Sequence, residues 1–134
     1  MLVESYIPAP DILQLAAKVV RARHLAQAGD FAEATALLEE AVSIQASIPY
    51  MEPPYWYYPV QQSLAAVHLA AGDPATAALH FQGALATAPN NGWSLYGLHE
   101  AQRAMGDTVA AEVTAERLAE AWVGPDELLS LERL

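Results

Sequence analysis

Histidine has the broadest chemical repertoire of the residue types in this chain, since imidazole can bind a metal or carry a proton. The four copies are His24, His68, His80 and His99. His68 and His80 fall on the two helices of one expected hairpin and could approach each other, yet a zinc site needs three or four converging ligands. His99-Glu100 opens like a zinc-protease motif, but Arg103 stands where the second histidine would be. We therefore predict structural roles for the histidines and no metal site.

Catalytic groups of other kinds are equally sparse. The serines have no nucleophile signature around them, and there is no glycine-rich phosphate loop. The carboxylates are spread over helix positions that we expect to face solvent. The chain has no cysteine, which excludes disulfides and thiolate sites. We predict no catalytic residue and no cofactor, and we expect the protein not to be an enzyme.

A stripe of aromatic and charged residues suits binding better than catalysis. Trp93, Tyr96, Glu100 and Arg103 are three, four and three residues apart, so they share one face of a helix. The opposite stripe should supply the core; it contains Leu95, Leu98, Ala101 and Met105. Trp, Tyr and Arg are the residues found most often as binding hot spots. The alternative is that the two rings simply cover a neighbouring hairpin or the C-terminal helix.

A second aromatic cluster lies within a proline-rich connection. Its rings are Tyr50, Tyr55, Trp56, Tyr57 and Tyr58, and prolines stand at positions 49, 53, 54 and 59. The prolines should hold this connection extended and stiff. We favour the interpretation that the rings pack the connection onto the hairpins, because aromatic clusters usually pack. The other interpretation is an aromatic wall for a proline-rich or apolar peptide.

The elements that must position these residues form a repeat. Gly-Asp occurs at Gly29-Asp30, Gly72-Asp73 and Gly106-Asp107. The last two copies are 34 residues apart, and the first two are 43 apart, which is one period plus nine residues. Such a period indicates stacked helical hairpins. Glycine can end one helix in the left-handed conformation and Asp can cap the next, so each pair predicts a corner with almost no loop.

The same offsets recur inside each repeat. The positions five, nine and twelve residues after the glycine share a helix face, and the small residue comes first; they are Ala34, Leu38 and Ala41, then Ala77, Phe81 and Ala84, then Ala111, Ala115 and Leu118. We predict helices near 11–28, 31–47, 58–71, 74–87, 92–105 and 108–122. A short seventh helix, near 126–133, is expected after the stop signal Gly124-Pro125.

These repeats resemble the tetratricopeptide repeat (TPR) family. The second repeat carries the family's signature positions at Leu64, Ala65, Gly72, Ala77, Phe81, Ala84 and Pro89, and the third matches at Leu98, Gly106 and Ala111. The first repeat departs from the pattern, with Lys18 and Arg21 in its leading helix. The resemblance implies an all-α, right-handed α-solenoid of three TPR helix-turn-helix hairpins. The repeats would span 11–48, 58–91 and 92–123, with an N-terminal extension at 1–10, an aromatic insertion at 49–57 and a C-terminal capping helix at 124–134.

The resemblance also implies a concave groove lined by the first helix of each hairpin. Its contact positions here would be Trp93, Tyr96, Glu100, Arg103, Gln62, Leu69, Arg23 and Gln27. We therefore expect a protein–protein interaction module that binds a peptide or a partner protein in this groove. The lysine–asparagine clamp that some TPR domains use for a C-terminal carboxylate is absent from these positions, so a chaperone-tail receptor is not expected.

A narrower resemblance supports a different role. The strings from Pro49 to Val60 and from Asn91 to Leu98 are similar to the C-terminal repeats of longer, largely uncharacterised bacterial TPR proteins. The alternative is therefore a structural or self-assembling chain, either the end of a longer scaffold or a homodimer. Apolar residues of the first helix, such as Leu13 and Val20, would have no preceding repeat to cover them.

The amino-acid composition narrows the classes of partner that the chain is expected to bind. The chain carries 16 acidic and 6 basic residues, for a formal charge of −10. Such a balance argues against nucleic acid and against an anionic membrane surface. No run approaches the length of a membrane span. We expect a cytoplasmic protein, although the location of any longer parent protein stays open.

Overall fold

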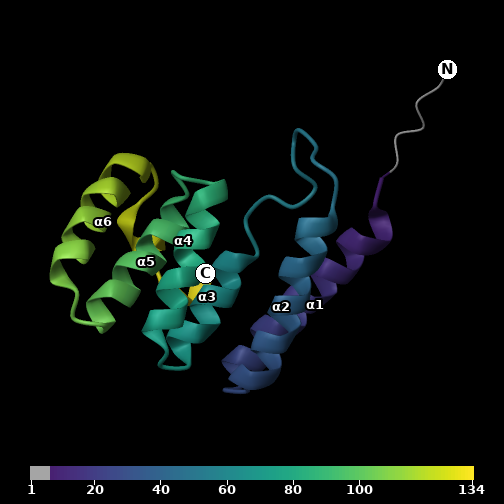
Figure 1. Ribbon diagram of the computed structural model, residues 1–134, viewed down its shortest axis with the longest axis horizontal. Helices are drawn as coiled ribbons and strands as arrows, with labels where there is room; N and C mark the ends of the chain where they lie inside the picture. The colour runs from purple at the N-terminus through teal and green to yellow at the C-terminus, as the bar shows by residue number, and fades with distance from the viewer. Residues whose placement is uncertain (1–6) are drawn as a thin grey trace.

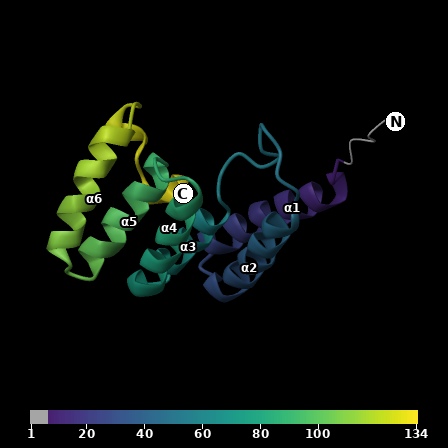
Figure 2. The same ribbon diagram turned by 45° about the horizontal axis from the view of Figure 1, so that its top comes forward.

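In the part of the chain that the structure describes, six α-helices form three consecutive hairpins that stack side by side in chain order (Figure 1). The computed structural model describes residues 7–134. The helices are α1 (Ala9–Gln27), α2 (Phe31–Ser47), α3 (Gln61–Ala70), α4 (Pro74–Thr87), α5 (Gly92–Ala104) and α6 (Thr108–Ala121). The described residues contain no strand. The arrangement is an all-α solenoid, as predicted, and Figure 2 shows the same three hairpins from another side.

The three Gly-Asp pairs form the predicted corners. Gly29, Gly72 and Gly106 have positive φ angles of 84°, 84° and 77°, a conformation that costs glycine little. The aspartate after each glycine caps the next helix: Asp30, Asp73 and Asp107 accept hydrogen bonds from backbone N–H groups three residues later. The two helices of each hairpin are therefore joined by a very short connection.

The core follows the repeated offsets. Ala34, Ala77 and Ala111, the first residue of each set, are all buried, so paired helices approach closely. Leu38 and Phe81 supply volume at the next offset and have no exposed surface. Leu95, Leu98 and Ala101 are buried as predicted, but Met105 is 42% exposed. Its prediction was wrong because α5 ends at Ala104, which leaves Met105 outside the helix as its C-cap.

The third helix begins at Gln61 rather than at 58 as predicted. A residue before proline avoids the helical conformation, which keeps Tyr58 out of the helix. The connection is bent at 52–53 and 55–58 rather than extended as predicted, and Gln45 on α2 fixes its end. Its Nε2 donates to the Tyr58 carbonyl at 2.9 Å, and its Oε1 accepts from the Val60 N–H at 2.8 Å.

The prediction of a seventh helix near 126–133 was also wrong. Two short 3₁₀ turns, η1 (Asp126–Leu128) and η2 (Leu131–Arg133), are separated by extended residues at Leu129 and Ser130. A helix this short gains little from its own hydrogen bonds. The segment instead buries Leu134 in the core formed by the second and third hairpins. It crosses the array from the end of α6 toward α3, where the C-terminal label stands in Figure 1.

The N-terminal side differs slightly from the prediction. Helix α1 begins at Ala9, so the last two residues of the expected extension at 1–10 are helical. Residues 1–6 of that extension lie outside the described part of the chain. Leu13 and Val20 are 70% and 68% exposed on α1.

Candidate interaction groove

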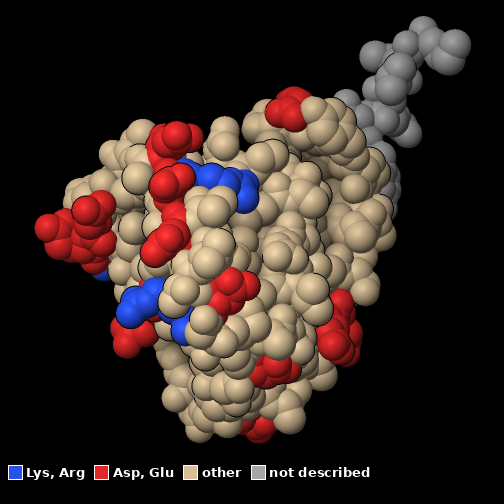
Figure 3. Space-filling view, turned by 60° about the vertical axis from the view of Figure 1, so that its left-hand side comes forward, with Lys and Arg blue, Asp and Glu red and all other residues tan. Residues whose placement is uncertain are grey.

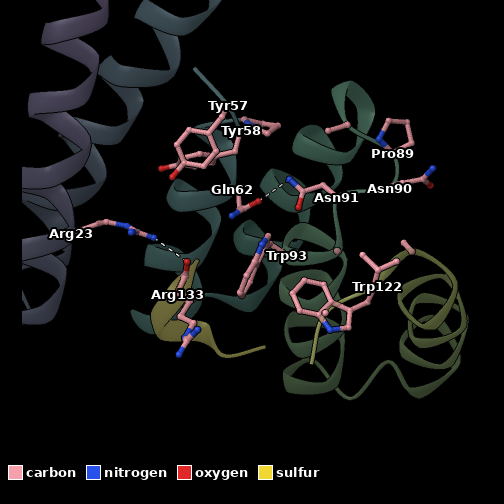
Figure 4. Close-up of a pocket in the computed structure, with 16 residues that line it drawn as sticks. Arg23, Tyr57, Tyr58, Gln62, Pro89, Asn90, Asn91, Trp93, Trp122 and Arg133 are labelled. Carbon is pink, nitrogen blue, oxygen red and sulfur yellow. Dashed lines mark hydrogen bonds between the residues drawn. The ribbon is translucent and has the colours of Figure 1, made fainter. Parts of the chain in front are cut away.

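An open cleft of about 960 Å³ lies where α1, the proline-rich connection, the start of α5 and the end of α6 come together (Figure 4). We call it the aromatic cleft; its main side chains are Arg23, Tyr57, Tyr58, Trp93, Trp122 and Arg133. A second cavity of about 520 Å³ shares Arg23 with it and continues along α1 and α3. Because they share Arg23, we refer to the two cavities together as the groove.

The rings of the aromatic cleft come from two sides. Trp93 meets Trp122 edge to face, with ring centroids 5.1 Å apart. Tyr57 and Tyr58 form a second edge-to-face pair at 4.9 Å. Tyr57 is 84% exposed, so its ring remains available to a ligand. The paired rings give the cleft an apolar surface, and Trp122 Nε1 is buried with no hydrogen-bond partner among the described residues.

A buried amide fixes the floor between these rings. Gln62, only 5% exposed, accepts hydrogen bonds through Oε1 from Asn91 Nδ2 at 2.9 Å and from Ser94 Oγ at 3.0 Å. Asn91 also caps α5 by accepting from the Ser94 N–H. The network therefore locks α3 to the first turn of α5, where Trp93 lies. We expected Gln62 to contact a ligand, but its carbonyl oxygen is already used within the protein.

Charge is distributed unevenly around the cleft. Among residues 7–134, no Asp or Glu lines it, although the chain has a formal charge of −10. On the face shown in Figure 3, acidic side chains lie in several groups and the few basic ones are scattered among them. Arg23 points to the main chain of Arg133, whose own guanidinium points away (Figure 4). Arg23 Nη2 donates to the Arg133 carbonyl at 3.1 Å and also to the main-chain oxygen of Leu134.

The structure brings together only some of the residues expected in the groove. Trp93, Gln62 and Arg23 line the aromatic cleft, and Gln27 lines the second cavity. Leu69 and Tyr96 are partly buried against the core of the second and third hairpins. Burial raises the pKa of Tyr96 above its ordinary value, the Glu100 carboxylate adds to this, and Arg103 opposes it.

The two charged residues of the predicted stripe pair with their neighbours. Glu100 accepts from Arg103 at 3.3 Å and lies 3.0 Å from His99 Nδ1. Neither Glu100 nor Arg103 lines the cleft or the second cavity. The stripe is therefore divided: Trp93 reaches the groove, while its charged end forms a local cluster.

The aromatic insertion serves two purposes. Trp56 packs against the core of the first hairpin, and the Tyr58 hydroxyl lies 3.0 Å from Ser63 Oγ. Tyr55 lines a separate hollow with Trp56. The ring of Tyr57, in contrast, is exposed at the edge of the aromatic cleft. Trp56 and Tyr58 therefore pack against the protein, whereas the neighbouring Tyr57 contributes exposed surface.

Trp122 was missed by sequence reasoning. Its ring lies over the first turn of α5, where a Cβ on Gly92 would be 2.7 Å from Trp122 Cε3. A glycine at the start of one helix and a tryptophan at the end of the next were the available signal. Nothing in the local pattern indicated that Arg133 and Leu134 would reach the same groove.

His68 and His80 do approach each other, with stacked rings 5.3 Å apart. In the described part of the chain, no group of three or more His, Cys, Asp or Glu side chains is placed to hold a metal ion. None of the helices formed by residues 7–134 combines the length and apolar character needed to cross a membrane.

Comparison with known proteins agrees with this architecture. A family model described as "Tetratricopeptide repeat" matches residues 68–130. Residues 68–130 are therefore assigned as tetratricopeptide repeats. The matched TPR segment runs from the end of α3 through η1 and so includes both corners that follow Gly72 and Gly106. TPR repeats generally mediate protein–protein interactions and typically form non-enzymatic modules. A search of curated proteins and a search of solved structures found no match.

Proposed function

We propose that this TPR chain binds an extended, apolar peptide segment of a partner protein in the aromatic cleft. The observation that carries the proposal is the cleft itself. It combines two edge-to-face aromatic pairs with an arginine, and the described residues that line it include no Asp or Glu, on a chain that is otherwise strongly acidic. Aromatic-lined grooves bind extended peptides by enclosing an apolar side chain and hydrogen-bonding the backbone.

The cleft has a place for each part of such a ligand. A leucine or proline side chain would lie among Trp93, Trp122 and Tyr57, whose rings line the cleft. Arg23 would donate to a carbonyl or carboxylate of the peptide, as it now does to main-chain oxygens. The buried network of Gln62 would keep the floor rigid, so little ordering cost would accompany binding.

Tyr57 offers the sharpest test, because its ring is exposed and its loss should leave the fold intact. We would select short random peptides displayed on phage against the wild-type chain. The affinities of the enriched peptides would then be measured by isothermal titration calorimetry for wild type and Tyr57→Ala. Tyr50 provides a matched control: it belongs to the same connection, is 86% exposed and does not line the cleft.

We expect Tyr57→Ala to weaken binding by about tenfold or more, which is the loss of one aromatic anchor. Tyr50→Ala should leave the affinity unchanged. Peptides that bind wild type and Tyr57→Ala equally well would place the binding surface elsewhere and would contradict the proposal.

A further inference from the structure

The groove across the hairpins is not empty along its whole length. Residues 131–134 lie in it, between α1 and α3, and Leu131, Glu132 and Leu134 line the second cavity beside Gln27, Ala66 and Ala70. Leu134 is only 3% exposed and belongs to the core cluster against which Trp93 and Tyr96 pack. The chain therefore already holds a segment of its own, with leucines at 131 and 134, where TPR residues were expected to bind a partner.

The attachment of this segment rests on few groups. Arg23 holds the main-chain oxygens of Arg133 and Leu134. Leu134 is the only residue between 122 and 134 that is buried. Leu131 is 40% exposed, and Val123, where the segment leaves α6, is 99% exposed. The two 3₁₀ turns add little stability of their own.

We propose that residues 125–134 form a displaceable strap, an intramolecular ligand that occupies the groove until a partner peptide of similar chemistry replaces it. The strap presents an apolar side chain to the core and two main-chain oxygens to Arg23, which is what the proposed partner peptide would present. Because the strap is tethered, its effective concentration at the groove is on the order of millimolar, so it competes with any peptide in solution. Only the identity of what replaces the strap rests on the proposed function; its opening does not.

The first test measures opening without any partner. The chain has no cysteine, so Leu134→Cys introduces a single thiol at the buried end of the strap. Ala65→Cys is the matched control, because Ala65 lies on α3, has no exposed surface and belongs to the same core cluster. The rate at which each thiol reacts with Ellman's reagent under native conditions reports how often its site opens.

We expect the thiol introduced by Leu134→Cys to react about a hundredfold faster than that of Ala65→Cys, because the strap opens locally while the hairpins stay folded. Equal rates, after correction for the rates in denaturant, would mean that the segment leaves only when the whole protein unfolds. That result would overturn the proposal.

The second test measures competition. The probe is a fluorescein-labelled synthetic peptide with the sequence of residues 125–134, and its binding is followed by fluorescence anisotropy. Leu134→Ser should loosen the strap and bind the probe about tenfold more tightly than wild type. Leu79→Ser alters an exposed aliphatic residue of α4 that lines neither cavity and should bind like wild type.

Equal affinity of wild type and folded Leu134→Ser for the probe would contradict displacement. Circular dichroism establishes that the variant is folded, and if it is not, the thiol experiment decides alone. Neither experiment uses an external partner, so a strap that opens while no selected peptide needs Tyr57 would leave this inference intact and reject the proposed function.

Discussion

At the scale of single residues, Gln62 decides how the aromatic cleft is shaped. Its side chain is buried, and its Oε1 accepts from both Asn91 and Ser94. Ser94 has no exposed surface, so its hydroxyl depends on this acceptor. A glutamine at a groove position suggests a ligand contact in the sequence. The structure shows instead an internal brace that joins two helices.

Replacing Gln62 by Ala should lower the free energy of unfolding by about 1–3 kcal/mol, because the Ser94 hydroxyl would be left buried without an acceptor. Chemical denaturation measures the change. Gln27→Ala, which alters an exposed glutamine on α1, should change stability by less than about 0.5 kcal/mol. A Gln62→Ala variant as stable as wild type would show that the hydrogen bonds contribute little, and adding Ser94→Ala to it should then cost nothing more.

At the scale of elements, the stacked pair of His68 and His80 joins α3 to α4. The pKa of His80 lies below its ordinary value of 6.5, chiefly because the ring is partly buried and also because His68 is near, while Glu39 on α2 opposes the shift. His80 Nδ1 lies 3.3 Å from Gln61 Nε2, and Asp73 faces His68 at 3.8 Å. Burial therefore favours the neutral form of the His80 ring.

Stability should therefore fall as the solution is acidified. The unfolded chain takes up a proton near the ordinary pKa of 6.5, whereas the folded chain resists it, so the unfolded state binds more protons between the two pKa values. The contribution of His80 is complete above that range and is lost as pH falls through it. Urea unfolding at about pH 7.5 and about pH 5.5 should show a smaller loss for His80→Gln than for wild type.

The control for this experiment is His24→Gln, since His24 is exposed on α1. That variant should follow the wild-type pH dependence. If His80→Gln loses as much stability on acidification as wild type, protonation of His80 is not responsible.

At the scale of the whole molecule, the excess of acidic residues is the feature that affects stability. The chain has a formal charge of −10 and only six lysines and arginines. Three acid–base pairs that involve these residues occur among the described residues: Lys18 with Glu40, Arg21 with Glu33, and Arg103 with Glu100. All of them include at least one exposed partner, so salt weakens attractions that are already small. Repulsion among the remaining carboxylates is spread over the whole array.

We expect the melting temperature to rise when sodium chloride is increased from about 20 to about 200 mM, because screening reduces the net repulsion more than it reduces the few ion pairs. Differential scanning calorimetry at constant pH measures the change, and potassium chloride should have the same effect. A falling melting temperature would mean that the ion pairs outweigh the repulsion.

The sequence by itself determined the repeating part of this protein. Gly29, Gly72 and Gly106 end helices, and the aspartate after each of them caps the next helix. At offsets of five and nine residues from the first two glycines, the pattern predicts buried side chains, and the residues found there are buried: Ala34, Leu38, Ala77 and Phe81. These properties depend on sterics and hydrogen bonds within a few residues, and a repeat displays them several times. That is why the fold and the family could be recognised from the pattern.

Only the tertiary structure decided the make-up of the groove. The start of α3 depends on Gln45 of another helix, and Trp122 reaches Gly92 from the far end of the third hairpin. The path of residues 125–134 depends on Arg23, which lies 111 residues from Leu134 in sequence. The local sequence pattern of this short segment predicts a helix, and the same pattern would do so whether or not a groove lies nearby. The free energy of burying Leu134 in that groove is a property of the assembled hairpins, and it prevails over the weak helix preference of the segment.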